Sequence, residues 1–219
     1  MNKAVILLSG GLDSSTTLYY ALSKGYQGHA LIFDYGQKHR KEIGQALRLA
    51  RAAGCPAVSL KISLPWKGSA LLDKSMAIPK GRASSTGIPV TYVPGRNIIF
   101  LSFAASYAEA IGAATIFIGA NAVDYSGYPD CRPEFMRAYQ TMLARGLKTS
   151  VEGRAVKIAA PLIRLSKAQI VRLANQLKVP LHLTWSCYAG GRRPCGVCDS
   201  CRLRAQGFRQ AGVPDPAMK

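Results

Sequence analysis

The residues best suited to chemistry near the start of the chain form a short loop, Ser9-Gly10-Gly11-Leu12-Asp13-Ser14. Two glycines let the backbone come close to a ligand oxygen, and the amide groups at the start of a helix attract phosphate. The serines add hydroxyl donors, and an aspartate suits such a place when it holds a Mg²⁺ ion that bridges to phosphate. The loop therefore predicts a phosphate site, although a Gly-Gly turn followed by an ordinary helix cap uses the same residues.

A second group of reactive side chains lies near the other end of the chain. Four of the six cysteines, Cys187, Cys195, Cys198 and Cys201, fall within fifteen residues and offer four thiolates to one tetrahedral ion. The two-residue spacings also occur in iron–sulfur proteins, but no fourth cysteine follows in the bacterial ferredoxin pattern. We expect one structural Zn²⁺ ion here, because four thiolates leave no coordination position open, and an iron–sulfur cluster is the alternative.

Alternating apolar runs and helical patterns must position these groups. They predict an α/β fold with a doubly wound parallel sheet, helices on both faces, and ligands bound beyond the carboxyl ends of the strands. Residues 97–111 are apolar on nearly every side and predict a buried helix, and 63–95 read as a long excursion rich in Pro and Gly. A capping box at Ser166-Lys167-Ala168-Gln169 predicts a helix start. We expect strands at 4–8, 29–33, 58–62, 115–118 and 156–160, and helices at 13–24, 40–53, 97–111 and 133–147.

Length and composition fit one α/β domain over residues 1–180, with a small helical, zinc-binding appendage over 181–219. The 29 Lys and Arg residues against 11 Asp and Glu give a net charge of +18, which favours anionic partners such as ATP or nucleic acid. The basic residues are scattered, so a basic solvated surface explains them as well. We expect a cytoplasmic protein, because the sequence shows neither a signal peptide nor an apolar stretch of membrane-spanning length.

The first loop, with its SGGxDS pattern directly after a strand, resembles the pyrophosphatase loop, or PP-loop, of ATP-cleaving synthetases such as GMP synthetase, NAD synthetase and several tRNA thiolases. It lacks the terminal Gly-Lys-Ser/Thr of a Walker A sequence. The resemblance implies attack at the α-phosphate of ATP, with loss of pyrophosphate and an adenylated substrate. Lys167, at the start of the capped helix, is the candidate for the later lysine that helps to hold the phosphates. The ATP-binding segment implied is Leu8, Ser9, Gly10, Gly11, Leu12, Asp13, Ser14, Ser15, Thr16, Thr17 and Leu18.

Further strings extend the resemblance to nearly the whole chain, from about Ala4 to Phe208. They are FDYGQKH from Phe33, VPGRN from Val93, DYSGYPDCRPEF from Asp124, TWSCY from Thr184, CGVCDSC from Cys195, and the pair Leu203-Arg204. In this order they resemble the 7-cyano-7-deazaguanine synthases of queuosine biosynthesis, in an adenine nucleotide alpha hydrolase-like fold. The resemblance implies that 7-carboxy-7-deazaguanine, ammonia and ATP give the nitrile through an adenylated carboxylate and then an adenylated amide. It also implies a homodimer.

The same resemblance suggests roles for residues outside the first loop. Asp34 and Gln37 are expected to contact the nucleotide, and Arg96 and Asn97 to hold phosphate or the substrate carboxylate. Each of these residues also has a structural alternative as a turn, a cap or a buried polar contact. We interpret Cys131 as a wall of the pocket rather than a nucleophile, and Cys55 as structural. The residues expected to recognise the purine-like ring are Asp124, Tyr125, Ser126, Asp130 and Arg132.

Two other functions remain open at this point. A tRNA sulfurtransferase with the same loop would use the positive charge for RNA, but it should carry paired redox cysteines or an RNA-binding domain, and only Cys55 and Cys131 lie outside the cysteine cluster. A zinc-ribbon nucleic-acid-binding module with a vestigial ATP loop is the second. We therefore expect small-molecule substrates, with no membrane and no obligatory nucleic-acid partner.

Overall fold

The computed structural model describes residues 2–81, 87–121 and 127–218. Five strands form one sheet in the order β3-β2-β1-β4-β5, and every neighbouring pair is parallel. This is the order of a doubly wound sheet, in which the chain leaves the middle strand in one direction and later returns to its other side. The strands are β1 (Lys3–Leu7), β2 (Gln27–Asp34), β3 (Ala57–Lys61), β4 (Thr115–Phe117) and β5 (Lys157–Ala159).

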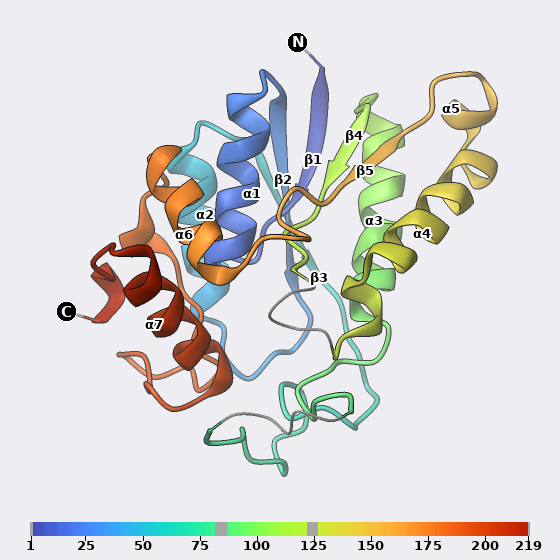
Figure 1. Cartoon of the computed structure of the whole chain (residues 1–219). Coiled ribbons are helices and arrows are strands. Elements are labelled where there is room, and N and C mark those ends of the chain that lie inside the picture. Colours follow the sequence, from blue (N-terminus) through green and yellow to red (C-terminus); the bar gives the residue numbers. More distant parts are fainter. Residues whose placement is uncertain (1, 82–86, 122–126, 219) are drawn as a thin grey trace.

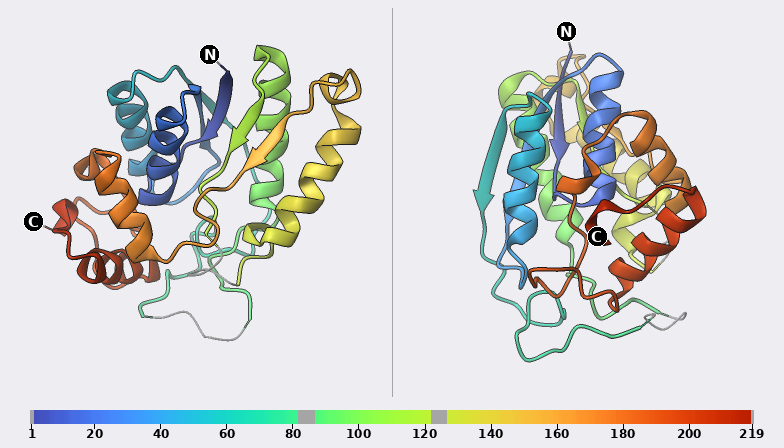
Figure 2. Two further views of the ribbon diagram at one scale, coloured as in Figure 1. Left: turned by 45° about the horizontal axis from the view of Figure 1, so that its top comes forward. Right: turned by 90° about the vertical axis from the view of Figure 1, so that its left-hand side faces the viewer.

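The helices are arranged in layers around this sheet. In Figures 1 and 2, α1 and α2 cover one face, α3 and α4 cover the other, and α6 and α7 continue the first layer outward. Short 3₁₀ turns lie at Pro129–Cys131, Leu181–Leu183 and Pro216–Met218. The helices are α1 (Leu12–Ser23), α2 (Lys41–Ala52), α3 (Arg96–Ile111), α4 (Pro133–Gly146), α5 (Lys148–Val151), α6 (Lys167–Gln176) and α7 (Asp199–Ala211).

The central strand β1 is apolar and buried from Ala4 to Leu7 because both of its faces are covered there. Ile6 packs in the cluster formed with α1 and α2, whereas Val5 and Leu7 pack in the cluster formed with α3 and α4. A third cluster joins α1, α6 and α7, and Phe208 of α7 is 2% exposed within it. The cysteine-bearing end of the chain is thus packed onto the α/β core through α7.

The α/β class and the doubly wound sheet predicted from sequence are confirmed, and so is the capping box of α6. The helix expected over 97–111 is present as α3, but the expectation that it is buried is wrong for one of its sides. Ile98 and Phe103 of α3 are 45% and 41% exposed, because only one side of this helix packs against the sheet. When a helix is apolar on every side, its sequence does not determine which side packs against the sheet.

The carboxyl ends of the strands point down in Figure 1, towards the long connection between β3 and α3. That connection contains neither helix nor strand among its described residues, in agreement with the excursion expected from its prolines and glycines. The connections from β1 and β4 diverge to opposite faces of the sheet at this edge. A crevice is expected where neighbouring connections part in this way.

Candidate functional site

The loop after β1 is held by its own hydroxyl groups. The Oγ atoms of Ser9 and Ser14 lie 3.0 Å apart, and Ser14 Oγ also accepts a hydrogen bond from the Ser9 amide at 3.2 Å. Gly10 has φ 81°, and a Cβ there would lie 2.4 Å from the carbonyl oxygen of Glu42, so α2 requires glycine at this position. On the other side a Cβ at Gly119 would meet Ser14 N at 2.9 Å. The loop is therefore clamped between α2 and the connection after β4.

The acidic residue of this loop is paired with the lysine expected to act beside it. Lys167 Nζ lies 3.0 and 2.8 Å from the two carboxylate oxygens of Asp13, across 154 residues of sequence. Lys167 is only 9% exposed, and its stem crosses α7 at Gly207, where a Cβ would lie 2.4 Å from Lys167 Cγ. A lysine and a carboxylate at a helix start can together grip phosphate oxygens and a divalent cation.

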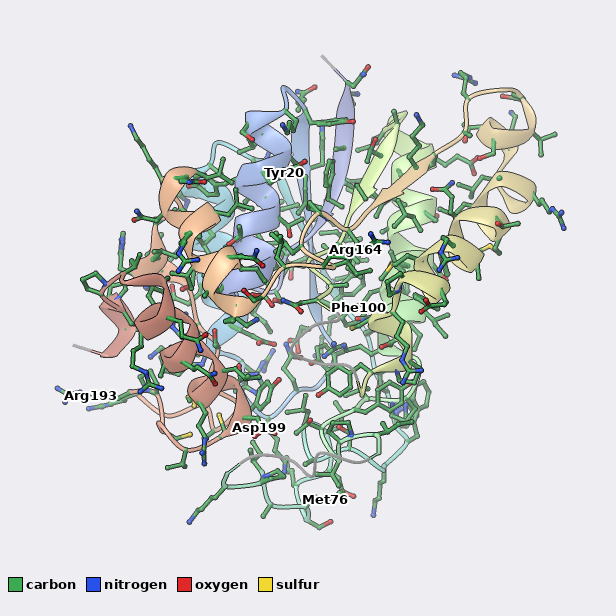
Figure 3. The ribbon with its side chains drawn as sticks, in the orientation of Figure 1. Tyr20, Met76, Phe100, Arg164, Arg193 and Asp199 are labelled. Carbon is green, nitrogen blue, oxygen red and sulfur yellow. The ribbon has the colours of Figure 1, made fainter. Side chains whose placement is uncertain are left out.

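A cavity of about 250 Å³ opens beside this loop. The loop with Asp13 and Lys167 lines it, and so do Arg96 and Asn97 at the start of α3. Phe100, labelled near the centre of Figure 3, also lines it and stacks on Phe33 with ring centroids 4.0 Å apart. One space thus joins a phosphate-binding turn to an arginine and an aromatic wall.

Burial keeps two side chains near Arg96, those of Tyr35 and Cys131, in their neutral form. Burial raises the pKa of Tyr35 to about 12, although the charge of Arg96 opposes the shift. Burial likewise raises the pKa of Cys131 to about 11, so its thiol stays protonated at neutral pH. This agrees with our interpretation of Cys131 as a pocket wall, because the thiolate is the nucleophilic form. Among the described residues no carboxylate forms an ion pair with Arg96.

The four clustered cysteines meet in space at the start of α7. Their sulfur atoms all lie within 4.8 Å of one another, and Cys195 Sγ and Cys201 Sγ are 4.0 Å apart. Tetrahedral coordination by four thiolates requires sulfur separations of about 3.8 Å. Backbone amides of Cys195 and Cys198 point at sulfur atoms of the cluster at 3.3 and 3.4 Å, which favours the thiolate state. The donor set and its spacing fit a four-coordinate metal ion.

The cysteine cluster is connected to the phosphate loop through Trp185. Its amide donates to the carbonyl of Gly10 at 2.8 Å, and its indole Nε1 donates to the carbonyl of Cys187 at 3.0 Å. Lys41 Nζ lies 3.7 Å from the centre of the same indole ring. Arg204 of α7 secures this segment with a hydrogen bond to Thr184 Oγ1 at 2.8 Å. Movement of the cysteine cluster would therefore displace Trp185 and, through its amide, the Gly10 carbonyl of the loop.

Comparison with protein families identifies the chain. The family model described as "Queuosine biosynthesis protein QueC" matches residues 3–212. The chain belongs to the QueC family. It is 54% identical over 220 residues to a "7-cyano-7-deazaguanine synthase" of Nostoc sp. (strain PCC 7120 / SAG 25.82 / UTEX 2576), covering 98% of this chain and 96% of that protein. It is 53% identical over 215 residues to the protein of that name from Acetivibrio thermocellus, with 98% and 96% covered. The resemblance seen in the sequence is confirmed.

Solved structures agree with this QueC chain in fold. The NMN synthetase of Francisella tularensis aligns with a TM-score of 0.52 and 18% identity, covering 99% of this chain and 80% of that chain. A predicted subunit of a tRNA methyltransferase from Methanocaldococcus jannaschii aligns with a TM-score of 0.51 and 14% identity, covering 80% and 75%. At these identities the matches speak for the architecture alone.

The structure separates the residues predicted for ATP into two groups. Leu8, Ser9, Gly11, Leu12, Asp13 and Ser14 line the cavity. The hydroxyls of Ser15, Thr16 and Thr17 instead donate to carbonyls one turn back in α1, at 2.7–2.9 Å. They and Leu18 are buried, and they shape the helix start without facing the cavity. Gly10 supports the loop from behind.

The other predicted residues are also divided by the structure. Arg96, Asn97 and Lys167 line the cavity, whereas Asp34 pairs with Arg40 outside its lining. Gln37 is enclosed within the β2–α2 connection, where its Nε2 donates to Glu42 Oε1 at 3.1 Å. Asp130 supports α3 by accepting from the Asn97 amide at 3.1 Å, and Arg132 precedes α4 on the surface. Asp124, Tyr125 and Ser126 lie outside the described residues.

Several residues that line the cavity were not singled out from the sequence. They include Tyr35, His39, Glu42, Tyr128 and Trp185. Most of them fall inside strings already noted, and that was the available signal for their position. Glu42 carried no such signal, because a glutamate in the first turn of an amphipathic helix normally faces solvent.

Proposed function

We propose that this QueC chain converts 7-carboxy-7-deazaguanine, ammonia and ATP into 7-cyano-7-deazaguanine during queuosine biosynthesis, the activity named for its relatives. The observation that carries the proposal is the single cavity that joins the phosphate loop to Arg96. The reaction needs both ends, because ATP must be held with its α-phosphorus against a carboxylate oxygen of the second substrate.

At the phosphate end, Ser9, Ser14 and the amides of the loop bind the phosphate chain. Lys167 lies beside them and neutralises phosphate charge, while Asp13 would hold Mg²⁺, which would supply further positive charge to the phosphates. The present Asp13–Lys167 pair keeps both groups at the loop. When nucleotide binds, each group exchanges part of this contact for phosphate or cation.

At the other end, Arg96 is suited to a planar carboxylate because its guanidinium can donate two parallel hydrogen bonds. Asn97, held through its amide by Asp130, fixes the start of α3 from which Arg96 projects. Phe100 provides an apolar surface for a purine-like ring. These contacts support the choice of an aromatic carboxylate as the acceptor.

The chemistry uses the phosphate loop twice. The carboxylate oxygen attacks the α-phosphorus, pyrophosphate leaves, and the carbonyl carbon becomes electrophilic. Ammonia forms a C–N bond to that carbon, and AMP leaves with the electron pair of the broken C–O bond. The amide oxygen then attacks the α-phosphorus of a second ATP, and a second pyrophosphate leaves. Loss of AMP with the electrons of the C–O bond, and of the remaining N–H protons, gives the nitrile. We assign the enzyme to the ATP-dependent ligases that form carbon–nitrogen bonds.

We propose that Cys187, Cys195, Cys198 and Cys201 bind one structural Zn²⁺ ion. The support is the sulfur spacing and the absence of an open position among four thiolates. Such thiolates persist where the environment keeps them reduced, which supports a cytoplasmic location. Over the described residues no helix is long and apolar enough to cross a membrane.

We also propose a homodimer formed through the exposed side of α3. Its exposed positions include Ile98, Ser102, Phe103 and Ser106, which form an uncharged stripe on a chain of net charge +18. Two copies can approach along such a stripe without bringing their positive charges together. Nucleic acid has no required part in this proposal.

The test is direct incubation of the purified protein with 7-carboxy-7-deazaguanine, ATP, Mg²⁺ and ammonia. Mass spectrometry should detect the nitrile, and AMP and pyrophosphate should form with it. Omission of ATP is the control, and Asp13→Asn should reduce AMP formation by removing the cation ligand. Failure to form both nitrile and AMP would overturn the proposal.

A further inference from the structure

The cavity contains a carboxylate whose charge is not balanced by a lysine or arginine. Among the described residues, the acidic side chains that line it are Asp13 and Glu42, and Asp13 is paired with Lys167. Glu42 Oε1 accepts from Gln37 Nε2 and Glu42 Oε2 from His39 Nε2, both at 3.1 Å. No lysine or arginine of the described residues lies within ion-pair distance of it. A carboxylate in the cavity with no lysine or arginine beside it can bind a cationic ligand.

His39 presents the second feature that calls for a ligand. Its side chain is 3% exposed, and its Nδ1 has no hydrogen-bond partner among the described residues. The Glu42 carboxylate accepts, so this hydrogen bond requires a proton on His39 Nε2, and Nδ1 can then act as an acceptor. A buried acceptor without a donor destabilises the folded protein. A bound molecule that donates an N–H group to Nδ1 would satisfy this acceptor, and the Glu42 carboxylate at Nε2 would stabilise a proton taken up by the ring.

The pair lines the same cavity as the phosphate loop and Arg96. The backbone of Glu42 presses on Gly10 of the phosphate loop, and the charges of both Glu42 and Arg96 act on Tyr35. The ring of Tyr188 lies beside the His39 ring, with the two ring centroids 5.9 Å apart. The C–N bond of the proposed reaction must form inside this cavity, because the adenylated carbon has to be within reach of both the phosphate loop and Arg96.

We propose that the Glu42–His39 pair binds ammonium and accepts one of its protons. This rests on the proposed function, which consumes ammonia, a molecule that is mainly ammonium at neutral pH. Transfer of one N–H proton to the pair leaves the nitrogen with a lone pair. That lone pair forms the C–N bond, the C–O bond to AMP breaks with its electrons on AMP, and a second proton passes from nitrogen to solvent to give the neutral amide. The pair returns its proton to solvent between turnovers.

Glu42→Gln tests the proposal because it keeps the shape of the side chain and removes its charge. The matched control is Glu134→Gln, which alters an exposed glutamate of α4 paired only with the exposed Arg137. The wild type should bind ammonium, so its KM for total ammonia should change little between about pH 7 and pH 8.5. The variant should use only unprotonated ammonia, so this KM should fall about tenfold per pH unit, from a value at least tenfold above wild type at pH 7.

Two further measurements separate this role from others. Substrate-dependent exchange of pyrophosphate with ATP reports adenylation without ammonia and should persist in Glu42→Gln. Hydroxylamine, which is largely uncharged at neutral pH, should restore the variant's rate of acyl transfer to near that of wild type. An ammonia KM with wild-type size and pH dependence would overturn the proposal, as would loss of exchange in a variant that melts like wild type. If the wild type itself shows no exchange, the proposed function fails instead.

Discussion

The substitution Gly207→Ala on α7 should weaken ATP use at a loop almost two hundred residues away in sequence. A Cβ at Gly207 would lie 2.4 Å from Lys167 Cγ, 3.0 Å from Lys167 Cβ and 3.2 Å from its backbone carbon. These atoms are not the flexible tip of the side chain, so Lys167 must shift as a whole. Its Nζ then leaves the position in which it contacts Asp13 at 2.8 Å.

The size of the effect follows from what Lys167 holds. Loss of one well-placed charged hydrogen bond costs about 1.5–3 kcal/mol, which corresponds to roughly a 10- to 150-fold fall in kcat/KM for ATP. Stability should change less, because overpacking of about 1–3 kcal/mol is partly offset by a helix-propensity gain of about 1 kcal/mol for alanine. Pyrophosphate release at varied ATP and thermal unfolding measure the two effects separately.

A matched glycine provides the control. Gly44 also lies inside a helix, α2, but a Cβ there would meet no atom within 4 Å. Gly44→Ala should stabilise the protein by about 0.5–1 kcal/mol and leave ATP use unchanged. In a Lys167→Ala background, where the crowded Cγ is absent, Gly207→Ala should add little further loss. Wild-type kcat/KM for ATP in Gly207→Ala would refute the reasoning, and so would full additivity of the two substitutions.

Four other outcomes can be checked. Arg96→Lys should raise KM for 7-carboxy-7-deazaguanine about tenfold or more with little change in KM for ATP, because lysine cannot form two parallel hydrogen bonds to a carboxylate. Cys131→Ser should keep its rate within a few-fold from pH 7 to pH 9, because with a pKa of about 11 the Cys131 thiol stays protonated through most of this range; a large loss would mark it as a nucleophile. Phe103→Glu should shift the protein from dimer to monomer in light scattering without lowering its melting temperature, whereas an unchanged mass would place the interface elsewhere. Cys198→Ser should lower the zinc content from one ion per chain and raise KM for ATP through Trp185; unchanged KM in zinc-free protein would show that the cluster and the loop are independent.

The sequence was sufficient for features encoded by nearby residues. The sheet strands, the loop at residues 9–14 and the four cysteines each follow from a local pattern or spacing, and the structure places each of them as expected. Even the capping box at Ser166 is formed with both of its hydrogen bonds. Such features are predictable because their hydrogen bonds or coordination geometry close within a short segment.

Features that depend on distant partners could not be predicted. Nothing in the residue types indicates that Asp34 turns to Arg40 and that Glu42, eight residues later, faces the cavity. The direction of Glu42 follows from how the first turn of α2 presses on Gly10. The side of α3 that stays exposed is likewise decided by the sheet, and the apolar sequence of the helix leaves the choice open.

The C-terminal segment has a mechanical reason to lie beside the phosphate loop. The sheet fixes the loop through β1, α2 restrains Gly10 from one side, and Gly119 restrains Ser14 from another. The carbonyl of Gly10 still needs a donor, which Trp185 supplies. Trp185 in turn needs the cysteine cluster to hold its position, because it lies in an irregular segment with little regular structure of its own. A metal ion bound by the four thiolates would therefore serve catalysis through position: it would hold the donor that keeps the phosphate-binding backbone in place.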